Sequence, residues 1–267
     1  MGIFGKLFEK LFEKKECSVC GGEIGLLGNR KLEDGNLCKE CAEKLSPWFD
    51  DRRHSTVDQI KEQLEYREAN RAKVEGFCVT RTLGEDMKVL LDEDAGLFMV
   101  TESNRLAEAN PDVLSFSDVT GCLLDIDEDR SELTREGEDG EEISYNPPRY
   151  EYDYDFHVVI HVRNPYFDEI RFRLNGSDVT VEEGSGQNAA TIRSGGRFDP
   201  TQNMEYRKYK KMGEEIVEAL QQARQQARDE KAVAAAPKVA VTCPCCGAQT
   251  IPNANNCCEY CGGVIEG

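Results

Sequence analysis

Ten of the twelve cysteines stand in two short segments near the ends of the 267-residue chain, and this placement constrains the fold more than any other feature. The first segment contains two Cys-x-x-Cys pairs, Cys17, Cys20, Cys38 and Cys41. The second, residues 243–261, contains six cysteines. Such clusters indicate either the disulfides of a secreted protein or tetrahedral zinc sites. We expect no signal peptide, because charged residues interrupt the apolar N-terminal residues at every turn, and the pairing therefore favours zinc.

The second segment allows more than one choice of ligands. The pattern Cys-Pro-x-Cys-Gly followed by Cys-x-Tyr-Cys-Gly selects Cys243, Cys246, Cys258 and Cys261. Cys245 and Cys257 would then be spare, and a two-metal site that uses all six cysteines is the alternative. Four thiolates fill a tetrahedral shell and leave no position for water, so we expect two structural Zn²⁺ ions and no catalytic one. Segments this small have almost no core, and the metal would supply about 10–16 kcal/mol of folding free energy.

Between the clusters, the pattern of apolar residues predicts one larger domain. The period changes to alternation in residues 77–183, and we expect strands at 77–83, 87–91, 97–101, 119–126, 156–162 and 170–174. A helix should follow at residues 203–231, with a buried stripe of Tyr209, Met212, Ile216, Leu220 and Ala223. We expect His157 and His161 on the polar face of a strand, and Cys78 and Cys122 as small buried residues.

The sequence therefore predicts an α+β protein with a zinc ribbon at each end. Residues 1–15 should form an amphipathic helix and residues 55–76 a connecting helix that Ser55 and Asp58 cap, with His54 at the surface or in the cap. The complete set of expected parts is helix 1–15, ribbon 16–54, connecting helix 55–76, sheet domain 77–225 with an acidic loop at 130–149, helix extension and linker 226–240, and ribbon 241–267.

Residues 16–54 resemble the zinc-ribbon family numbered 4428 among domains of unknown function, which points to a bacterial protein. The segments that carry the resemblance are Cys17-x-x-Cys20, Ile24-Gly25-Leu26-Leu27, Lys31-Leu32-x-Asp34-Gly35, Cys38-x-x-Cys41 and Lys44-Leu45-Ser46-Pro47. Ile24, Leu26 and Leu27 read as a strand, and Asp34-Gly35-Asn36 as a hairpin turn. The resemblance implies a small metal-stabilised ribbon and brings no activity with it.

Residues 77–225 resemble the bacterial pleckstrin-homology-like fold, in which a C-terminal helix caps a bent antiparallel sheet. The matching segments are Leu90-Leu91-Asp92-Glu93, Gly96-Leu97-Phe98 and Val113-x-x-Phe116-x-x-Val119-x-Gly121. Some members bind phosphoinositides through a basic loop, whereas the loops here are acidic, which favours a protein partner. The last 25 residues are similar to the zinc-ribbon tails of many bacterial multidomain proteins.

The distribution of charge limits the partners. The net charge of the chain is −18, and residues 77–183 alone hold 27 acidic and 9 basic side chains. A surface of this kind repels nucleic acid and anionic lipid, so nucleic acid is an unlikely partner. No catalytic triad, phosphate-binding loop or open metal shell stands out, and we infer no small-molecule substrate and no enzymatic activity.

The preferred interpretation is a cytoplasmic zinc-binding adaptor or scaffold that binds an unidentified protein. The alternative is a stress or envelope component held at the inner face of the membrane by the helix at residues 3–15. Thiol–disulfide exchange by the Cys-x-x-Cys turns is a third reading, which the closed four-cysteine sets disfavour. Nucleic-acid binding by the ribbons is a fourth, and the scarcity of cations in the last ribbon weighs against it.

Overall fold

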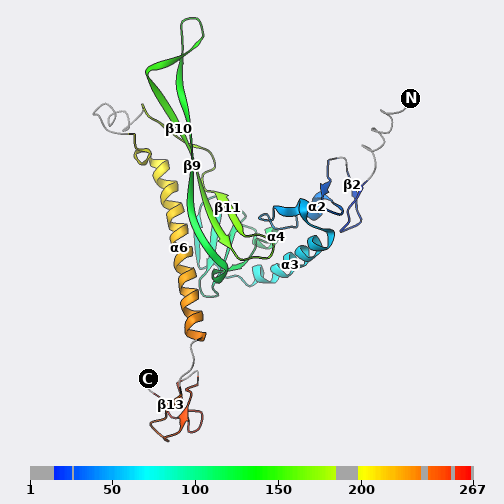
Figure 1. Cartoon of the computed structure of the whole chain (residues 1–267), viewed down its shortest axis with the longest axis vertical. Coiled ribbons are helices and arrows are strands. Elements are labelled where there is room, and N and C mark those ends of the chain that lie inside the picture. The colour runs from blue at the N-terminus through cyan, green and yellow to red at the C-terminus, as the bar shows by residue number, and fades with distance from the viewer. Residues whose placement is uncertain (1–14, 26, 185–197, 236–239, 254–255, 266–267) are drawn as a thin grey trace. The chain divides into compact units, whose positions relative to one another are not determined.

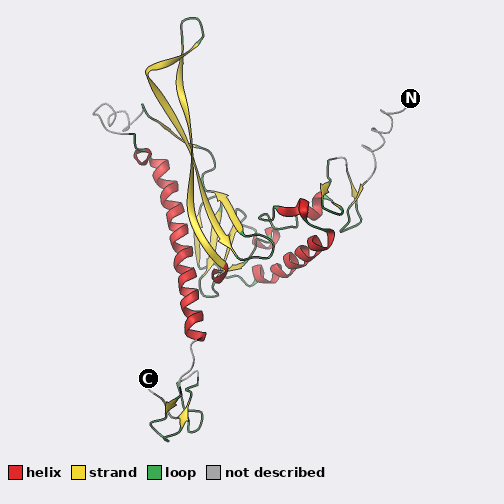
Figure 2. Ribbon diagram, viewed as in Figure 1, coloured by secondary structure: helices red, strands yellow, loops and turns green. Residues whose placement is uncertain are grey.

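The structure is a computed structural model that describes residues 15–25, 27–184, 198–235, 240–253 and 256–265 (Figure 1). The chain divides into two compact units, Met1–Gln225 and Gln226–Gly267. Helices and antiparallel sheets both contribute, which confirms the α+β prediction (Figure 2). The amphipathic helix predicted at residues 3–15 lies outside the described residues except for its last position.

The N-terminal ribbon consists of two short hairpins. Strand β1 (Lys15–Glu16) pairs with β2 (Glu23–Ile24), and β3 (Arg30–Lys31) pairs with β4 (Asn36–Leu37). The second hairpin confirms the predicted turn, which the bond from the Leu32 N–H to the Gly35 carbonyl closes at 2.9 Å. The predicted strand through Leu27 is wrong, because β2 ends at Ile24 and Leu27 is 93% exposed. Helix α2 (Lys39–Ala42) and the 3-10 turn η1 (Asp51–His54) complete the ribbon.

Helix α3 (Val57–Glu75) connects the ribbon to the sheets, and it contributes side chains to the core of the ribbon and to the core of the first sheet. Ile60 packs among the buried residues of the ribbon, and Val74 packs near the other end against the first sheet. The capping box is formed by Thr56 and Gln59, not by Ser55 and Asp58 as predicted. Ser55 is unsuited to that role because its hydroxyl donates to the Asp51 carbonyl at 2.9 Å.

The first sheet has the order β5-β6-β7-β8 and is antiparallel throughout. Its strands are β5 (Arg81–Gly84), β6 (Lys88–Asp92), β7 (Leu97–Thr101) and β8 (Leu114–Ser115), with helix α4 (Leu106–Ala109) between β7 and β8 and the turn η2 (Phe116–Asp118) after β8. These positions confirm three predicted strands. Cys78 precedes β5 and is exposed, so its predicted burial is wrong, whereas Cys122 is buried as expected.

The second sheet is organised by one long strand, β10 (Glu142–Val162). One edge of β10 pairs along most of its length with β9 (Val119–Glu136), and the other edge pairs first with β12 (Val179–Glu182) and then with β11 (Glu169–Arg173). Residues inside this sheet, such as Phe156 and Ile160, are fully buried. The strands predicted at 119–126 and 156–162 are therefore real but much longer than predicted.

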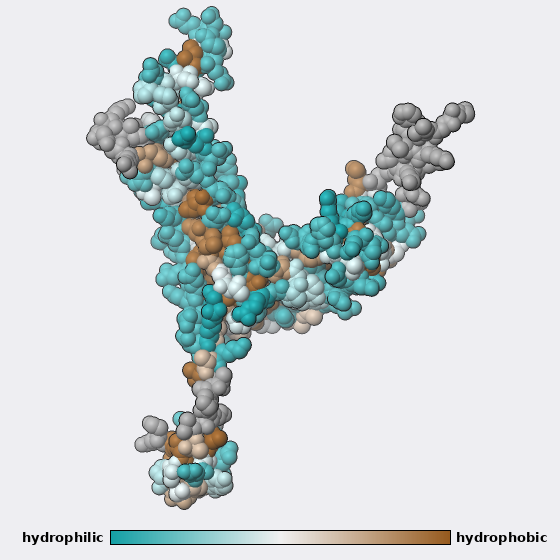
Figure 3. Space-filling model, in the orientation of Figure 1, coloured by the Kyte–Doolittle hydropathy of each residue, from teal (hydrophilic) through white to brown (hydrophobic). Residues whose placement is uncertain are grey.

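The prediction of an acidic loop at 130–149 is wrong. These residues form the outer part of the β9–β10 hairpin, and we call residues 130–149 the arm (Figure 1). Only residues 137–141 form a turn between the strands. Arginine and tyrosine side chains stack across the pair, with Arg130 lying 4.6 Å from the ring centroid of Tyr150. Such contacts stabilise a two-stranded ribbon that propensity alone would leave irregular. Figure 3 shows largely hydrophilic side chains over the arm.

Helix α6 (Met204–Ala235) follows the turn η3 (Pro200–Gln202) and packs against the second sheet. Tyr206 meets the ring of Tyr154 edge-on at 4.8 Å, and Ile216 and Leu220 are fully buried. The predicted stripe is confirmed at these two aliphatic residues, and its other members are half-buried. Gly213 allows a close approach, since a Cβ atom there would lie 2.4 Å from Leu124 Cδ1.

A buried polar network joins α3 to the ribbon and to the segment before β8. The Arg67 guanidinium donates to Asp112 Oδ1 at 2.8 Å and to the Lys44 carbonyl at 3.2 Å, while the Ser46 hydroxyl donates to Asp112 Oδ2 at 2.8 Å. Burial raises the pKa of the Asp112 carboxyl, and the Arg67 charge opposes that shift. Asn70 extends the network to the Asn110 side chain at 2.9 Å.

The second unit contains the hairpin β13 (Val241–Thr242) with β14 (Gln249–Thr250) and an isolated bridge between Cys257 and Val264. Its small core includes Cys243, Cys258 and Ile265. Among the residues described, no helix combines the length and the apolar character that crossing a bilayer requires.

Candidate metal centres

The first pair of cysteines in the N-terminal ribbon lies in a tight turn after β1. The Cys17 carbonyl accepts from the Gly21 N–H at 2.8 Å, and the Cys17 N–H donates to the Gly22 carbonyl at 2.8 Å. Gly21 has a φ of 72°, a backbone conformation that residues with a side chain rarely adopt. The turn places the sulfurs of Cys17 and Cys20 within 4.8 Å of the sulfurs of the second pair.

The second pair is held differently, at the start of helix α2. Cys38 is the N-cap residue, and its sulfur accepts from the Cys41 N–H at 3.4 Å. The Cys38 N–H in turn donates to the Cys17 sulfur at 3.4 Å, which connects the two pairs directly. Cys17 and Cys41 are buried while Cys20 is exposed, so the cluster lies at the edge of the ribbon core.

The four sulfurs have the spacing of a tetrahedral metal site. All of them lie within 4.8 Å of one another, and Cys20 and Cys38 are 3.8 Å apart. Sulfurs that surround an ion at about 2.3 Å in a tetrahedron stand about 3.8 Å apart, whereas a disulfide requires about 2.05 Å. The residues present therefore fit an ion such as zinc and do not form a disulfide.

The electrostatics of this cluster also favour a bound cation. Burial raises the pKa of Cys17, but hydrogen bonds from the backbone N–H groups of Cys20, Cys38 and Val19 outweigh it and bring the pKa to about 6. The pKa of Cys41 is instead strongly raised, by burial and then by the neighbouring thiols. Cys17 thus loses its proton easily, whereas burial and the neighbouring thiols oppose the loss of a proton from Cys41. A divalent cation at the centre would remove that opposition.

The C-terminal cluster repeats the turn of Cys17 twice. The Cys243 carbonyl accepts from the Gly247 N–H and the Cys258 carbonyl from the Gly262 N–H, each at 2.9 Å. Gly247 and Gly262 have φ values of 74° and 69°, close to that of Gly21. Three of the four Cys-x-x-Cys pairs in the chain therefore use the same backbone device, and only the pair at α2 departs from it.

This cluster has the same spacing of sulfurs as the first. Cys243 and Cys261 are 3.6 Å apart, Cys246 and Cys258 are 3.8 Å apart, and all four sulfurs lie within 4.8 Å of one another. Hydrogen bonds from backbone N–H groups, above all that of Cys246, lower the pKa of Cys243 to about 6. The Gly263 N–H lowers the pKa of Cys261, but hydrogen bonds with the thiols of Cys246 and Cys243 outweigh it and raise the pKa to about 12.

The two remaining cysteines of the segment lie outside this group of four. Cys245 is exposed and lies against Gly263, where an added Cβ atom would stand 2.7 Å from its sulfur. Cys257 lies in the bridge with Val264. The structure thus brings together the four cysteines that the Cys-Pro-x-Cys-Gly and Cys-x-Tyr-Cys-Gly patterns selected.

The three histidines lie apart from both clusters. His54 contacts Asp51 at 2.7 Å, while His157 and His161 lie 3.1 Å from Asp127 and 3.7 Å from Glu169. Within the described ranges, close groups of metal-ligand atoms are limited to the two cysteine clusters. The sequence analysis did not identify a cluster of cations on the N-terminal ribbon. Two pairs of adjacent basic residues, Arg30-Lys31 and Arg52-Arg53, form this cluster and are its sign in the sequence.

Comparison with known proteins adds a family name for the first centre. Residues 15–63 match the family model described as Domain of unknown function (DUF4428), which spans the first cysteine cluster and the start of α3. No curated protein and no solved structure matches the chain. The chain thus has a segment similar to a family without an assigned activity, built around four cysteines that could hold a metal ion.

Proposed function

We propose that this protein is a non-enzymatic zinc-binding adaptor, in which two zinc ribbons and the sheet domain bind other proteins. The observation that carries the proposal is that each centre has four cysteine sulfurs at tetrahedral spacing. A shell of four thiolates leaves no position at the metal for water or substrate. Such an ion stabilises a fold and does not catalyse a reaction.

Zinc is the metal that this donor set suits best. Soft thiolates in a tetrahedron select zinc or an iron–sulfur centre among the common metals, and paired Cys-x-x-Cys turns at two ends of a small ribbon are typical of structural zinc. Thiolate ligands stay reduced in the cytoplasm, which we propose as the compartment. The resemblance of residues 16–54 to a bacterial ribbon family supports a bacterial source.

The sheet domain would supply the main docking surface. We propose that it is pleckstrin-homology-like, which its two antiparallel four-stranded sheets and the packing of α6 support. The arm offers an exposed surface that combines carboxylates with tyrosine and arginine side chains. Aromatic and arginine side chains are enriched in protein interfaces, and the carboxylates disfavour nucleic acid.

The proposal is tested by crosslinking affinity purification with matched variants. Three baits are compared with the intact protein. The first is the double variant Cys41→Ser/Cys258→Ser, which removes one ligand from each metal centre, and the second has residues 134–148 of the arm replaced by Asn-Gly. The third, Cys78→Ser, is the control. The short turn is suitable because Leu133 and Arg149 face each other across the strands. Cys78 is exposed and outside both centres, so its variant should recover the same partners. The adaptor function is rejected if the metal-site and arm variants also recover every partner.

A further inference from the structure

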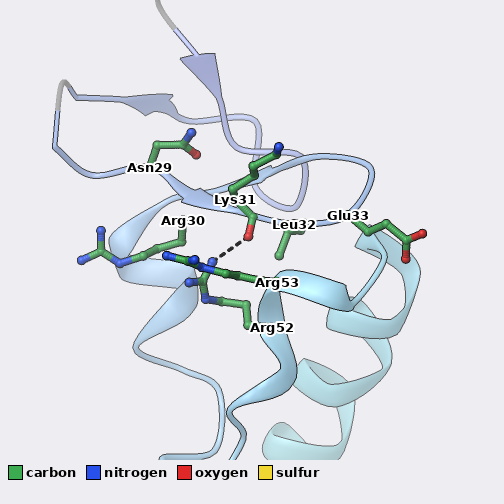
Figure 4. Close-up of a pocket in the computed structure, with 7 residues that line it drawn as sticks. All are labelled: Asn29, Arg30, Lys31, Leu32, Glu33, Arg52 and Arg53. Carbon is green, nitrogen blue, oxygen red and sulfur yellow. Dashed lines mark hydrogen bonds between the residues drawn. The ribbon is translucent and has the colours of Figure 1, made fainter.

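The N-terminal ribbon contains a cavity of about 710 Å³ that is lined mainly by cations (Figure 4). Arg30 and Lys31 come from β3, and Arg52 and Arg53 come from η1, about twenty residues later in the chain. The fold brings the two basic pairs together because the Arg52 guanidinium donates to the Lys31 carbonyl at 2.8 Å. Opposite them, Glu33 is the one acidic residue of the lining.

The positive charges of this pocket are not balanced by carboxylates. Arg30 donates to the Leu27 carbonyl at 3.3 Å and Arg52 to a carbonyl as described above, and both of these acceptors are neutral. Across the described part of the chain, none of the ion pairs involves Arg30, Lys31, Arg52 or Arg53. Figure 4 shows the three arginine side chains extending to the same side of the pocket, while Glu33 points away from them.

The cations are close enough to affect one another. Burial lowers the pKa of Arg52, and the charges of Arg30 and Arg53 lower it further. Like charges at short range are destabilising unless an anion or solvent compensates them. This concentration of positive charge is unusual in a chain whose net charge is −18. A bound anion would relieve the repulsion between the guanidinium groups.

We propose that this pocket binds a small ligand that carries phosphate groups, such as a phosphate monoester or a phosphoanhydride. Guanidinium groups match the oxygens of phosphate with paired hydrogen bonds, and several of them from two chain segments can surround one such group. The volume of the cavity falls in the range of pockets for small molecules, roughly 300–1,000 Å³. The acidic surface of residues 77–183 opposes extended polyanions such as nucleic acid or an anionic bilayer, and a compact anion avoids that repulsion.

The test is isothermal titration calorimetry of the full-length, metal-loaded protein with inorganic pyrophosphate as the probe at low salt. Arg53→Gln is the informative variant: Arg53 is exposed, so we expect its replacement to leave the ribbon folded. Loss of one charge-assisted contact should weaken binding by roughly tenfold, and Arg30→Gln combined with Arg53→Gln by roughly a hundredfold. The control is Arg71→Gln, because Arg71 pairs with Glu68 on α3 and is outside the pocket. It should bind pyrophosphate as the intact protein does.

Three results would overturn the proposal. The first is no heat of binding at millimolar pyrophosphate, and the second is equal affinity in the intact protein and the Arg53→Gln variant when both carry the same metal content. The third is tighter, Arg53-dependent binding of a short DNA duplex or of vesicles containing anionic lipid, which would assign the surface to a macromolecule. The proposal of a ligand with linked phosphate groups would be supported if the intact protein bound pyrophosphate more tightly than inorganic phosphate. The double variant should then lose the binding of both anions.

Discussion

Replacing Asp112 with alanine should destabilise the first unit more than any exposed substitution. The Asp112 carboxylate is fully buried, the Arg67 side chain is 7% exposed, and they are 2.8 Å apart. Alanine would leave the guanidinium buried without a counter-charge and the Ser46 hydroxyl without its acceptor. Breaking a buried pair by removing one partner costs about 3–5 kcal/mol, and we expect a loss of unfolding free energy in that range.

The assay is urea unfolding followed by tryptophan fluorescence. Trp48 is the one tryptophan of the chain, and its backbone N–H donates to the Ser46 hydroxyl at 3.2 Å, so its fluorescence reports on this junction. The control is Glu68→Ala, which removes an exposed ion pair with Arg71 and should change the free energy by less than about 1 kcal/mol. A loss below about 1 kcal/mol for Asp112→Ala would refute the reasoning.

A second comparison separates the value of the pair from the penalty of breaking it. Because burial outweighs the effect of Arg67 on the pKa of Asp112, the pair itself contributes little net stability. Combining Arg67→Met with Asp112→Leu should therefore recover at least half of the loss. A double variant as unstable as Asp112→Ala would mean that the charge pair is strongly stabilising.

Further predictions concern the metal centres and α6. Chelation should unfold the ribbons but leave the sheet domain folded, which amide resonances in a two-dimensional NMR spectrum would show, and persistence of the ribbon resonances would contradict it. Because the pKa values of Cys41 and Cys261 are raised in the metal-free clusters, binding of zinc must expel protons, and the affinity for zinc should rise with pH; a competition with a zinc dye that gave equal affinity at mildly acidic and mildly alkaline pH would oppose this. Ile216→Ala should lower the unfolding free energy by about 2–5 kcal/mol in calorimetry, because the side chain is fully buried, and a smaller effect would show that α6 packs loosely.

The turns that build the two four-cysteine clusters could be predicted from the sequence because their information is local. A Cys-x-x-Cys turn followed by glycine encodes its own geometry, as the φ values of Gly21, Gly247 and Gly262 show. The strand Leu97–Thr101 and the buried Ile216 and Leu220 also followed from short-range periodicity. These features need no knowledge of what lies across the fold.

The misses share a dependence on contacts between distant residues. The arm was expected to be a loop because its charges and prolines oppose strand propensity, and only the pairing of β9 with β10 reveals the strand. The basic pocket required Arg30 and Arg52 to meet, and the buried network required Arg67 to meet Asp112 across 45 positions. Cys78 was expected to be a small buried residue, but it lies before the edge strand β5 and is exposed.

The arm has a consequence for how the protein behaves when it is concentrated. Between Leu133 and Arg149, the described strand residues of β9 and β10 pair only with each other, so their outer edges offer backbone groups to any extended chain. Such edges are templates for aggregation unless charge keeps copies apart. The arm carries Glu132, Glu136, Glu138, Asp139, Glu141 and Glu142. Mutual repulsion of these carboxylates would keep the protein soluble, and salt or acid that weakens it should promote self-association.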